Sequence, residues 1–398
     1  MHIDHKTPFS QSPRQSSQYS LASSRLQYPR QRAKFILSPY CQSETFWIEW
    51  LQVLCSGPLR WDRRVSITIR DVAKAAGVSI TTVSRALNGY SDVGEKTRRK
   101  VALVAQELNY RPNAVARSLV MNETKTIGLL VSELTRDRVG HFFMFRVMHG
   151  MHDRLAELGY DLILFSTTTA RQRLVSYLDF CMQRRLDGVI VMGIRLDDPY
   201  IQEVVDSPLS SVVIDLPLQS ERCGYVMTDN VYGVKLAVRH LFDKGHRTIG
   251  FVNGYSQAAV SRDRRRGYEE GLLQMGLPVD ETLMHEADFS LPGGGDGLQQ
   301  LLQARPDLTA IAFASDLMAI GGLQRARELG IAVPERLAIV GFDDIELAEF
   351  STPPLTTIRQ KRLEMGMRAA EMVVATIKNQ AAPHGILLAP ELVVRGTT

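Results

Sequence analysis

The stretch TIRDVAKAAGVSITTVSRALNG, residues 68–89, decides the fold of the N-terminal part of the chain. Thr68 is of a residue type that favours helix N-caps, and apolar residues at helical spacing follow it. These are Ile69, Val72, Ala73 and Ala76. Gly77 interrupts this pattern, and Ser79 is placed to cap a second helix that runs to about Asn88. The stretch therefore predicts two short helices joined by a turn that contains glycine.

A third helix is predicted after the loop 89–94. Its apolar stripe has the same helical spacing. The stripe consists of Val101, Val104, Ala105 and Leu108. Three short helices, of which the first two are separated by a turn with glycine, make up a helix-turn-helix bundle. We therefore expect residues 66–111 to form a DNA-binding domain.

The second predicted helix has one apolar side and one polar side. With residues placed about 100° apart, Val83, Ala86 and Leu87 fall together on the apolar side. The opposite side carries side chains of the types that bond base edges or contact a thymine methyl group. They are Ile80, Thr81, Ser84, Arg85 and Asn88. No Asp or Glu lies on that side, so the pattern favours a helix that reads DNA; an ordinary solvated helix face is the alternative.

Charge is distributed unevenly along the chain, although the net charge is only +4. Residues 1–65 carry a net charge of +5 and residues 66–124 carry +4, whereas residues 125–398 carry −5. A basic end on a slightly acidic body is typical of a protein that binds a polyanion through that end.

Cysteine usage and hydropathy favour a cytoplasmic protein. The 4 cysteines show no CxxC pair and no metal-like spacing with histidine, which is typical of reduced structural thiols. No apolar run approaches the roughly 18–20 residues that span a bilayer. The N-terminus also lacks the pattern of a secretion signal. We expect no membrane partner, no metal and no cofactor.

Residues 1–65 are predicted to be a disordered extension. Residues 1–45 contain nine serines and six glutamines without apolar periodicity. The run FWIEWLQVLC, 46–55, is more apolar and leaves a partner-binding helix open. A translation start assigned too early, with Val65 as the true start, is a further alternative.

Residues 125–398 have the pattern of an α/β protein, because short apolar runs alternate with helical stretches. The predicted strands are 127–131, 161–165, 188–192, 211–215, 248–252, 310–314 and 337–342. The predicted helices are 143–158, 171–185, 231–244, 264–275 and 317–329. Ligands of such sheets bind beyond the carboxyl ends of the strands, where Asp215, Asp229 and Asp343 lie.

The glycine-rich run GGGDG, 293–297, resembles a phosphate-binding loop only superficially. No strand is predicted before it, and no dinucleotide-binding spacing follows it. We interpret this run as a flexible loop.

Residues 68–89, followed by VGEKTRRKVALVAQELNYRPNAVARSL at 93–119, closely resemble the lactose-repressor-type (LacI/GalR) family of bacterial transcriptional regulators. The motif D-V-A-x-x-A-G-V-S-x-x-T-V-S-R-x-L-N is highly specific for this family, and the similarity runs from about Ser66 to the C-terminus. The resemblance implies an α + α/β fold. Its parts are a helix-turn-helix three-helix bundle, a hinge helix and linker at 112–124, and a periplasmic-binding-protein-like sensor of two α/β subdomains at 125–398. The first subdomain would span 126–227 and 359–383, and the second 228–356 and 386–395.

The same resemblance implies roles for individual residues of the DNA-binding part. Ile80 and Thr81 occupy the two variable recognition positions, and Arg85 occupies a base-contacting position. Leu119, in a segment that resembles a hinge helix folding on operator DNA, would insert into the central minor-groove step. The remaining implied DNA-binding positions are Thr68, Ser79 and Thr82, which mostly hold phosphates, and Asn113 and Ala116 in the hinge segment.

The resemblance also implies a small effector in the cleft between the two subdomains, where its binding would change their relative angle. Its implied contacts are Phe142, Asp215, Arg264, Phe289, Asp316 and Asp343. Carboxylates and a guanidinium bond hydroxyl groups, and an aromatic ring stacks on a sugar face, so we expect a sugar. Taken singly, three of these residues also fit a purely structural role: Arg264 in a basic helix start, Asp316 as a helix cap and Phe289 as core.

The function expected is that of a sequence-specific DNA-binding transcriptional regulator, most often a repressor in this family. One short helix gives little specificity, so we expect a homodimer, or a higher oligomer, on near-palindromic operator DNA. A solute-binding protein of a transport system would account for 126–398 but not for 66–120. An α/β enzyme is a third alternative, although no nucleophile–base pair or P-loop stands out. The identity of the effector, and whether it releases DNA or promotes binding, stay open.

Overall fold

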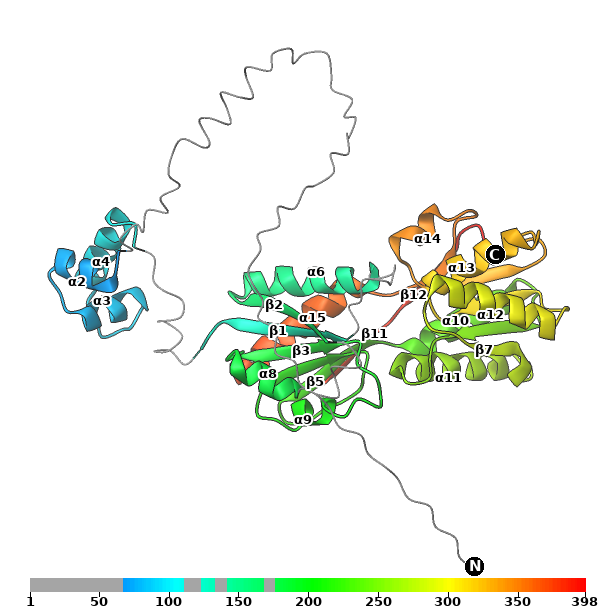
Figure 1. The fold of residues 1–398 in the computed structure, drawn as a ribbon, viewed down its shortest axis with the longest axis horizontal. Coiled ribbons are helices and arrows are strands. Elements are labelled where there is room, and N and C mark those ends of the chain that lie inside the picture. Colours follow the sequence, from blue (N-terminus) through cyan, green and yellow to red (C-terminus); the bar gives the residue numbers. More distant parts are fainter. Residues whose placement is uncertain (1–66, 111–122, 133–141, 168–175) are drawn as a thin grey trace, which may run out of the picture. The chain divides into compact units, whose positions relative to one another are not determined.

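The computed structural model describes residues 67–110, 123–132, 142–167 and 176–398 (Figure 1). The chain divides into two compact units between Asn109 and Tyr110, close to the end predicted for the DNA-binding domain. The predicted N-terminal extension and most of the predicted hinge segment lie outside the described residues. Among the described helices, none has the length and apolar character needed to cross a membrane.

The described part of the first unit, residues 67–109, is a bundle of three helices. They are α2 (Ile69–Ala76), α3 (Ile80–Leu87) and α4 (Glu95–Glu107). Each helix packs on the other two. The residues buried between them are Val72, Ala73, Ala76, Val83, Ala86, Val101 and Ala105. The predicted helix-turn-helix bundle is thereby confirmed.

Local hydrogen bonds and one glycine determine where α2 and α3 begin and end. The Asp71 carboxylate accepts hydrogen bonds from the backbone N–H and the hydroxyl of Thr68, at 2.8 and 2.7 Å, which lower the pKa of Asp71. Gly77 ends α2 with a φ of 63°, a left-handed conformation that costs glycine no steric clash. Ser79 Oγ then accepts the N–H of Thr82 at 3.0 Å and caps α3.

The described residues of the second unit form two six-stranded sheets. The first has the strand order β11-β5-β4-β3-β1-β2 and is parallel throughout. Its strands are β1 (Thr126–Ser132), β2 (Asp161–Thr167), β3 (Gly188–Met192), β4 (Ser210–Ile214), β5 (Cys223–Thr228) and β11 (Gly385–Leu388). Helices α6 (Phe142–Glu157) and α15 (Arg362–Ile377) cover one face (Figure 1). Helices α8 (Tyr177–Gln183) and α9 (Ile201–Val205) cover the other.

Strand residues of the first sheet alternate between two apolar clusters. In β1, Ile127, Leu129 and Val131 pack with α6 and α15, whereas Leu130 packs with the side chains of α8 and α9. Successive strand residues point to opposite faces, so a strand covered on both faces must be apolar throughout. This explains the continuous apolar runs in the sequence.

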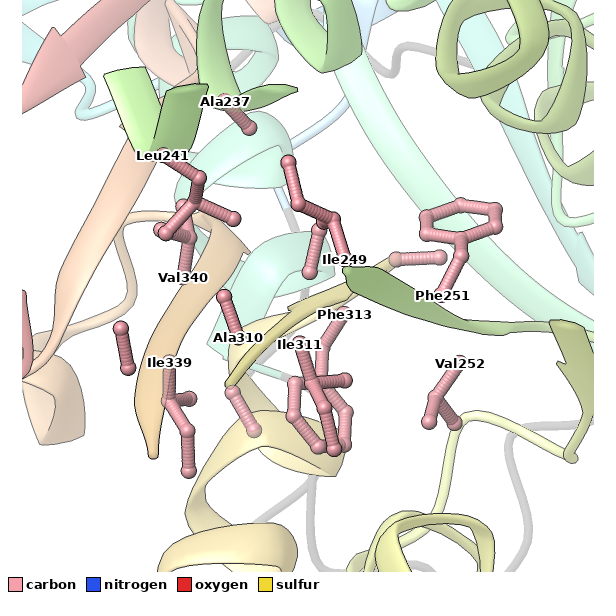
Figure 2. Close-up of a cluster of buried hydrophobic side chains, with 14 of the residues drawn as sticks. Ala237, Leu241, Ile249, Phe251, Val252, Ala310, Ile311, Phe313, Ile339 and Val340 are labelled. Atoms are coloured by element: carbon pink, nitrogen blue, oxygen red, sulfur yellow. The ribbon is translucent and has the colours of Figure 1, made fainter. Parts of the chain in front are cut away.

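The second sheet has the strand order β12-β10-β9-β8-β6-β7, and only the β10–β12 pair is antiparallel. Its strands are β6 (Ile249–Asn253), β7 (Met284–Glu286), β8 (Ala310–Phe313), β9 (Ala338–Asp343), β10 (Thr356–Arg359) and β12 (Glu391–Val393). The surrounding helices are α10 (Asn230–Asp243), α11 (Ala259–Gln274), η1 (Glu281–Leu283), α12 (Leu291–Ala304), α13 (Asp316–Glu328) and α14 (Glu346–Phe350). Figure 2 shows Phe251 and Val252 of β6 pointing to opposite sides of this sheet.

One predicted subdomain boundary is wrong. The prediction places the whole segment 386–395 in the second subdomain, but Ile386–Leu388 lies in β11, which pairs with β5 of the first sheet. Only β12 joins the second sheet, where it pairs with β10. Ala389 and Pro390 connect the two strands.

The interpretation of GGGDG, 293–297, as a flexible loop is also wrong, because this run lies inside α12. Ser290 Oγ caps the helix by accepting the N–H of Gly293 at 3.0 Å. A Cβ on Gly294 would lie 2.0 Å from the carbonyl oxygen of Met318, so only glycine lets α12 pack this closely on α13. The glycines therefore serve helix packing.

Candidate functional site

Helix α3 presents its predicted polar side away from the bundle core. Its apolar side is buried through Val83 and Ala86. Of the five residues predicted to read bases, Ile80, Thr81 and Arg85 are exposed, and Ser84 and Asn88 are partly buried. An apolar side chain such as Ile80, which is 45% exposed, is suited to contact a thymine methyl group.

The predicted phosphate-holding hydroxyls lie at helix N-termini. Thr68 is the N-cap residue of α2 and Ser79 that of α3, and Ser79 Oγ lies 2.8 Å from Thr82 Oγ1. Helix N-termini present unpaired N–H groups and a partial positive charge, which attract anions. Ser79 and Thr82 are thus placed where α3 can hold a phosphate group, whereas the Thr68 hydroxyl is already bonded to the Asp71 carboxylate.

Arg85 is engaged by a neighbour that sequence reasoning missed. Its Nη2 lies 2.6 Å from Asp92 Oδ2, and its Nε donates to Asp92 Oδ1 at 3.1 Å. The guanidinium also lies 4.9 Å from the centre of the Tyr90 ring. About half of each charged side chain is exposed, so water competes for this pair and it can open at small cost.

The predicted hinge contacts Asn113, Ala116 and Leu119 lie outside the described residues. Their roles stay predictions. The same holds for the predicted hinge helix to which they belong.

A cavity of about 220 Å³ lies in the second unit at the carboxyl ends of several parallel strands. Val131 of β1, Met192 of β3 and Asp215 after β4 contribute from the first sheet. Tyr255 and Phe289 contribute from the loops that follow β6 and β7. Both subdomains therefore line this cavity, at the location where parallel α/β sheets bind ligands.

Asp215 is the one charged residue among the described residues that line the cavity. Its Oδ1 is buried and has no hydrogen-bond partner among the described residues. Burial raises the pKa of Asp215 to about 6, and the Arg264 charge opposes this rise. Its φ of 61° is rare for a residue with a side chain, and such strain gathers at functional sites. Asp215 is therefore a cavity-lining residue with unused hydrogen-bonding capacity.

Phe289 lines the cavity and also packs, partly buried, against the apolar core of the second subdomain. Its φ of 62° is left-handed, as for Asp215. The ring lies against Gly254, where an added Cβ would come within 2.0 Å of it. Tyr255 meets the same ring edge-on, with centroids 5.3 Å apart. These contacts hold the ring in place against the cavity.

Arg264 is buried beside the cavity and does not line it. Its Nε donates to Asn230 Oδ1 at 2.8 Å, its Nη1 donates to the carbonyl oxygen of Ala314, and its Nη2 lies 3.9 Å from Asp343 Oδ1. Burial lowers the pKa of Arg264, while Asp343 and Asp215 raise it. Arg264 therefore offsets the charge of two carboxylates.

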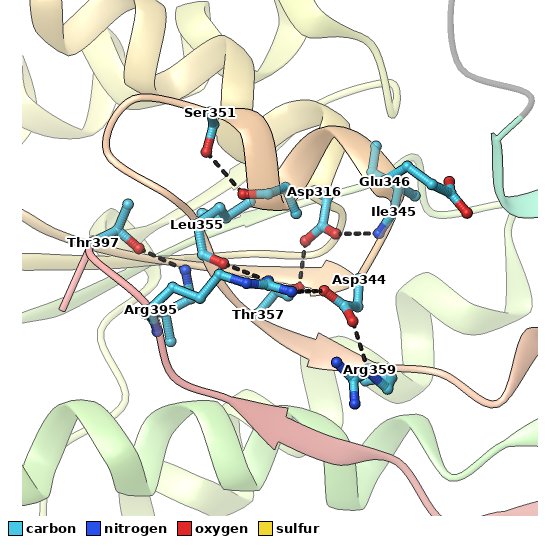
Figure 3. A network of polar contacts seen from close by, with 12 residues as sticks. Asp316, Asp344, Ile345, Glu346, Ser351, Leu355, Thr357, Arg359, Arg395 and Thr397 are labelled. Atoms are coloured by element: carbon cyan, nitrogen blue, oxygen red, sulfur yellow. Dashed lines mark hydrogen bonds and ion pairs between the residues drawn. The ribbon is translucent and has the colours of Figure 1, made fainter.

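Asp316 is fully buried and bonded within the protein (Figure 3). Its Oδ2 accepts the N–H of Ile345 at 2.8 Å, and its Oδ1 accepts the hydroxyl of Thr357. Burial, together with the nearby Asp343, raises the pKa of Asp316 well above its ordinary value. Asp316 is not the cap of α13, because Ser315 takes that place. Its carboxylate instead holds the loop after β9.

Asp343 connects the two subdomains. Its Oδ1 accepts a hydrogen bond from Gln360 Nε2 at 2.6 Å, and Gln360 Oε1 in turn accepts the hydroxyl of Thr228, at the end of β5, at 2.5 Å. Burial raises the pKa of Asp343, and Arg264 opposes the rise. Sequence reasoning missed Gln360, although it lies where the chain crosses from β10 to α15.

Phe142 reaches this region through its backbone. Its side chain is not among those that line the cavity, where Phe143 and Met144 lie instead. Arg362, at the start of α15, donates to the carbonyl oxygen of Phe142 at 3.4 Å and to that of Asp344 at 2.6 Å. This buried cation, which sequence reasoning also missed, links α6 of one subdomain to the β9–α14 loop of the other.

Comparison with protein families and curated relatives matches both units. Residues 68–113 match the model of bacterial regulatory proteins, lacI family, and residues 238–398 match that of a periplasmic binding protein-like domain. The HTH-type transcriptional repressor PurR of Vibrio atlanticus (strain LGP32) is 34% identical over 333 residues, which cover 83% of this chain and 98% of the relative. The ribose operon repressor of Haemophilus influenzae is 36% identical over 330 residues, which cover 82% and 97%.

Comparison with solved structures also finds regulators of transcription. The lac repressor dimer bound to operator and the anti-inducer ONPF has a TM-score of 0.71 at 28% identity and covers 83% of this chain and 99% of its own. The complex of the transcriptional regulator CelR with cellobiose has a TM-score of 0.65 at 32% identity and covers 83% and 100%. Both the predicted fold class and the predicted family are confirmed. With relatives more than 30% identical over 82–83% of its length, the chain belongs to the LacI family of bacterial regulatory proteins.

Proposed function

We propose that this chain represses transcription by binding near-palindromic operator DNA as a homodimer, under the control of a small effector in the sensor cavity. The observation that carries the proposal is the exposed side of α3, which presents Ile80, Thr81 and Arg85 on a helix-turn-helix bundle and belongs to a helix without acidic residues. The similarity to repressors, and to a repressor dimer solved on operator DNA, supports it. A single eight-residue helix reads few base pairs, which is why two copies are needed.

The effector is proposed to act by changing the angle between the two subdomains. Both subdomains line the cavity, so a bound molecule favours whichever arrangement gives it the better contacts. Arg362 and the Asp343–Gln360–Thr228 chain cross between the subdomains and would carry that change to α6. Helix α6 belongs to the subdomain that follows the DNA-binding part along the chain, so the change is proposed to reach the spacing of the recognition helices.

We propose that the effector is a sugar or a similarly hydroxylated small molecule. The proposal is supported by two residues that line the cavity: the Asp215 carboxylate is suited to accept a hydrogen bond from a hydroxyl group, and the Phe289 ring is suited to stack on apolar C–H groups. A ribose operon repressor and a regulator solved with cellobiose are among the similar proteins. Asp316 and Arg264 are proposed to support the cavity from behind and not to touch the effector.

The protein is proposed to act in the cytoplasm, where its DNA lies. The alternative function, a solute-binding protein of a transport system, is not favoured, because it leaves the lacI-family match at residues 68–113 without a role.

The test is a selection of bound sequences from random double-stranded DNA with the full chain. We expect the enriched sequences to form a near-palindrome of two half-sites. A protein that is folded by circular dichroism but enriches no sequence would contradict the proposal. Candidate sugars are then screened by their effect on the thermal stability of the same protein.

A further inference from the structure

The loop between α3 and α4 places one carboxylate against the arginine of the recognition helix. Asp92 bonds the side edge of the Arg85 guanidinium, formed by Nε and Nη2, through both of its oxygens. A guanidinium has five N–H donors in a planar fork, so the edge that includes Nη1 stays unoccupied by Asp92. That remaining edge has the two-donor geometry with which arginine bonds O6 and N7 of guanine.

The position of Asp92 is set by a braced loop. Arg98 of α4 donates from its Nη2 to the carbonyl oxygens of Tyr90 at 2.7 Å and Val93 at 3.3 Å, on either side of Asp92. The Tyr90 N–H bonds back to the carbonyl oxygen of Arg85 at 3.1 Å, and Val93 is buried. The backbone on either side of Asp92 is therefore fixed by the fold, which keeps the carboxylate within reach of Arg85 although the ion pair itself can open.

We propose that Asp92 is a specificity-determining residue that positions Arg85 for one base pair of the operator. This inference rests on the proposed function, namely that α3 reads DNA. A free arginine side chain has many rotamers and bonds any nearby phosphate or acceptor, whereas one held along its side edge offers only the other edge. Asp92 also occupies donors that would otherwise bond phosphate, which weakens binding to unrelated DNA.

The experiment measures dissociation constants of the full chain on its selected operator, on every single-base-pair variant and on random DNA, at one salt concentration. Arg85→Ala first identifies the base pair at which preference is lost. Asp92→Ala is then expected to lose about tenfold discrimination at that base pair and at no other. Asp92→Glu, which keeps the carboxylate, is expected to retain part of this discrimination. In the Arg85→Ala background, Asp92→Ala is expected to change nothing at that position.

Glu95→Gln is the matched control, because Glu95 is an exposed acidic residue three positions away that pairs with Arg99 instead. It is expected to strengthen binding to all sequences by a similar factor.

The inference is overturned if Asp92→Ala behaves like Glu95→Gln, or if the effect of Asp92→Ala is the same with and without Arg85. Circular dichroism and thermal unfolding of each variant report whether the bundle is intact. If the unmodified chain selects no sequence, the proposed function fails too; if it selects one and Asp92→Ala keeps full discrimination, only this inference fails.

Discussion

The polar residues of α3 and those around the sensor cavity differ in exposure and in hydrogen bonding. On α3, Thr81 and Arg85 are exposed, and the one ion pair there is half in water. Around the cavity, Arg264 and Asp316 are buried and bonded to the protein itself. The first set keeps much of its hydrogen-bonding capacity for a partner, whereas the second uses most of that capacity within the fold.

The sequence predicted both groups as binding residues, but the difference in burial gives them different expected roles. Where side chains are exposed, a substitution should change binding and leave stability alone. Where they are buried and bonded, it should change stability first. Asp215 stands between the two kinds, because it is only partly buried and its buried Oδ1 has no hydrogen-bond partner among the described residues.

The largest effect is expected for Asp316→Ala. If this substitution left stability unchanged, the distinction between buried residues that stabilise the fold and exposed residues that bind DNA would be wrong. The Ile345 N–H and the Thr357 hydroxyl lose their acceptor inside the protein, so the free energy of unfolding should fall by about 2–4 kcal/mol. Urea unfolding of the full chain measures this. Asp307→Ala, at an exposed aspartate of the same subdomain, is the control and should have little effect.

The pH dependence of stability tests Asp215. Its pKa of about 6 in the folded chain exceeds the ordinary 3.8, so the folded state holds the proton more tightly than the unfolded state does. The free energy of unfolding should therefore fall as pH rises from about 4 to 6, by at most about 3 kcal/mol from this group. Asp215→Asn should remove that part of the slope. Parallel pH profiles for the two proteins would show that Asp215 titrates normally.

A smaller loss, of about 1–3 kcal/mol in specific operator binding, is expected for Arg85→Ala. The loss should be greater on the selected operator than on random DNA, because only the former offers a base edge for the guanidinium. Fluorescence anisotropy with both DNAs measures the difference, and thermal unfolding should be nearly unchanged. Equal losses on both DNAs would show that Arg85 contacts phosphates alone.

The smallest effect is expected for Ile80→Val. It removes one methylene group from an exposed side chain, which costs at most about 0.8 kcal/mol if that group is buried on DNA. The change should be confined to the base pair that Ile80 contacts, as a binding series over single-base variants would reveal. Leu103→Val, at an exposed apolar residue of α4, is the matched control. If the two substitutions had similar effects, Ile80 would not contact a base.

The sequence predicted those features that depend on neighbours along the chain. The caps at Thr68 and Ser79 and the strands buried on both faces follow from local spacing. Asp316 illustrates what could not be predicted, because its bond to Thr357 joins residues 41 positions apart. The glycine-rich run of α12 could not be recognised as helical for the same reason. Gly294 is needed for packing against Met318, which lies on another helix. Asp92 did carry a local signal, since it is an acidic residue just beyond the recognition helix.

The central claim is that one molecule bound in the sensor cavity changes the affinity of α3 for operator DNA. The most direct measurement is the operator dissociation constant of the full chain with and without a sugar that raises its thermal stability. We predict a change of at least about fivefold that is lost in Asp215→Asn. A sugar that stabilises the protein through the cavity but leaves the operator dissociation constant unchanged would contradict the account.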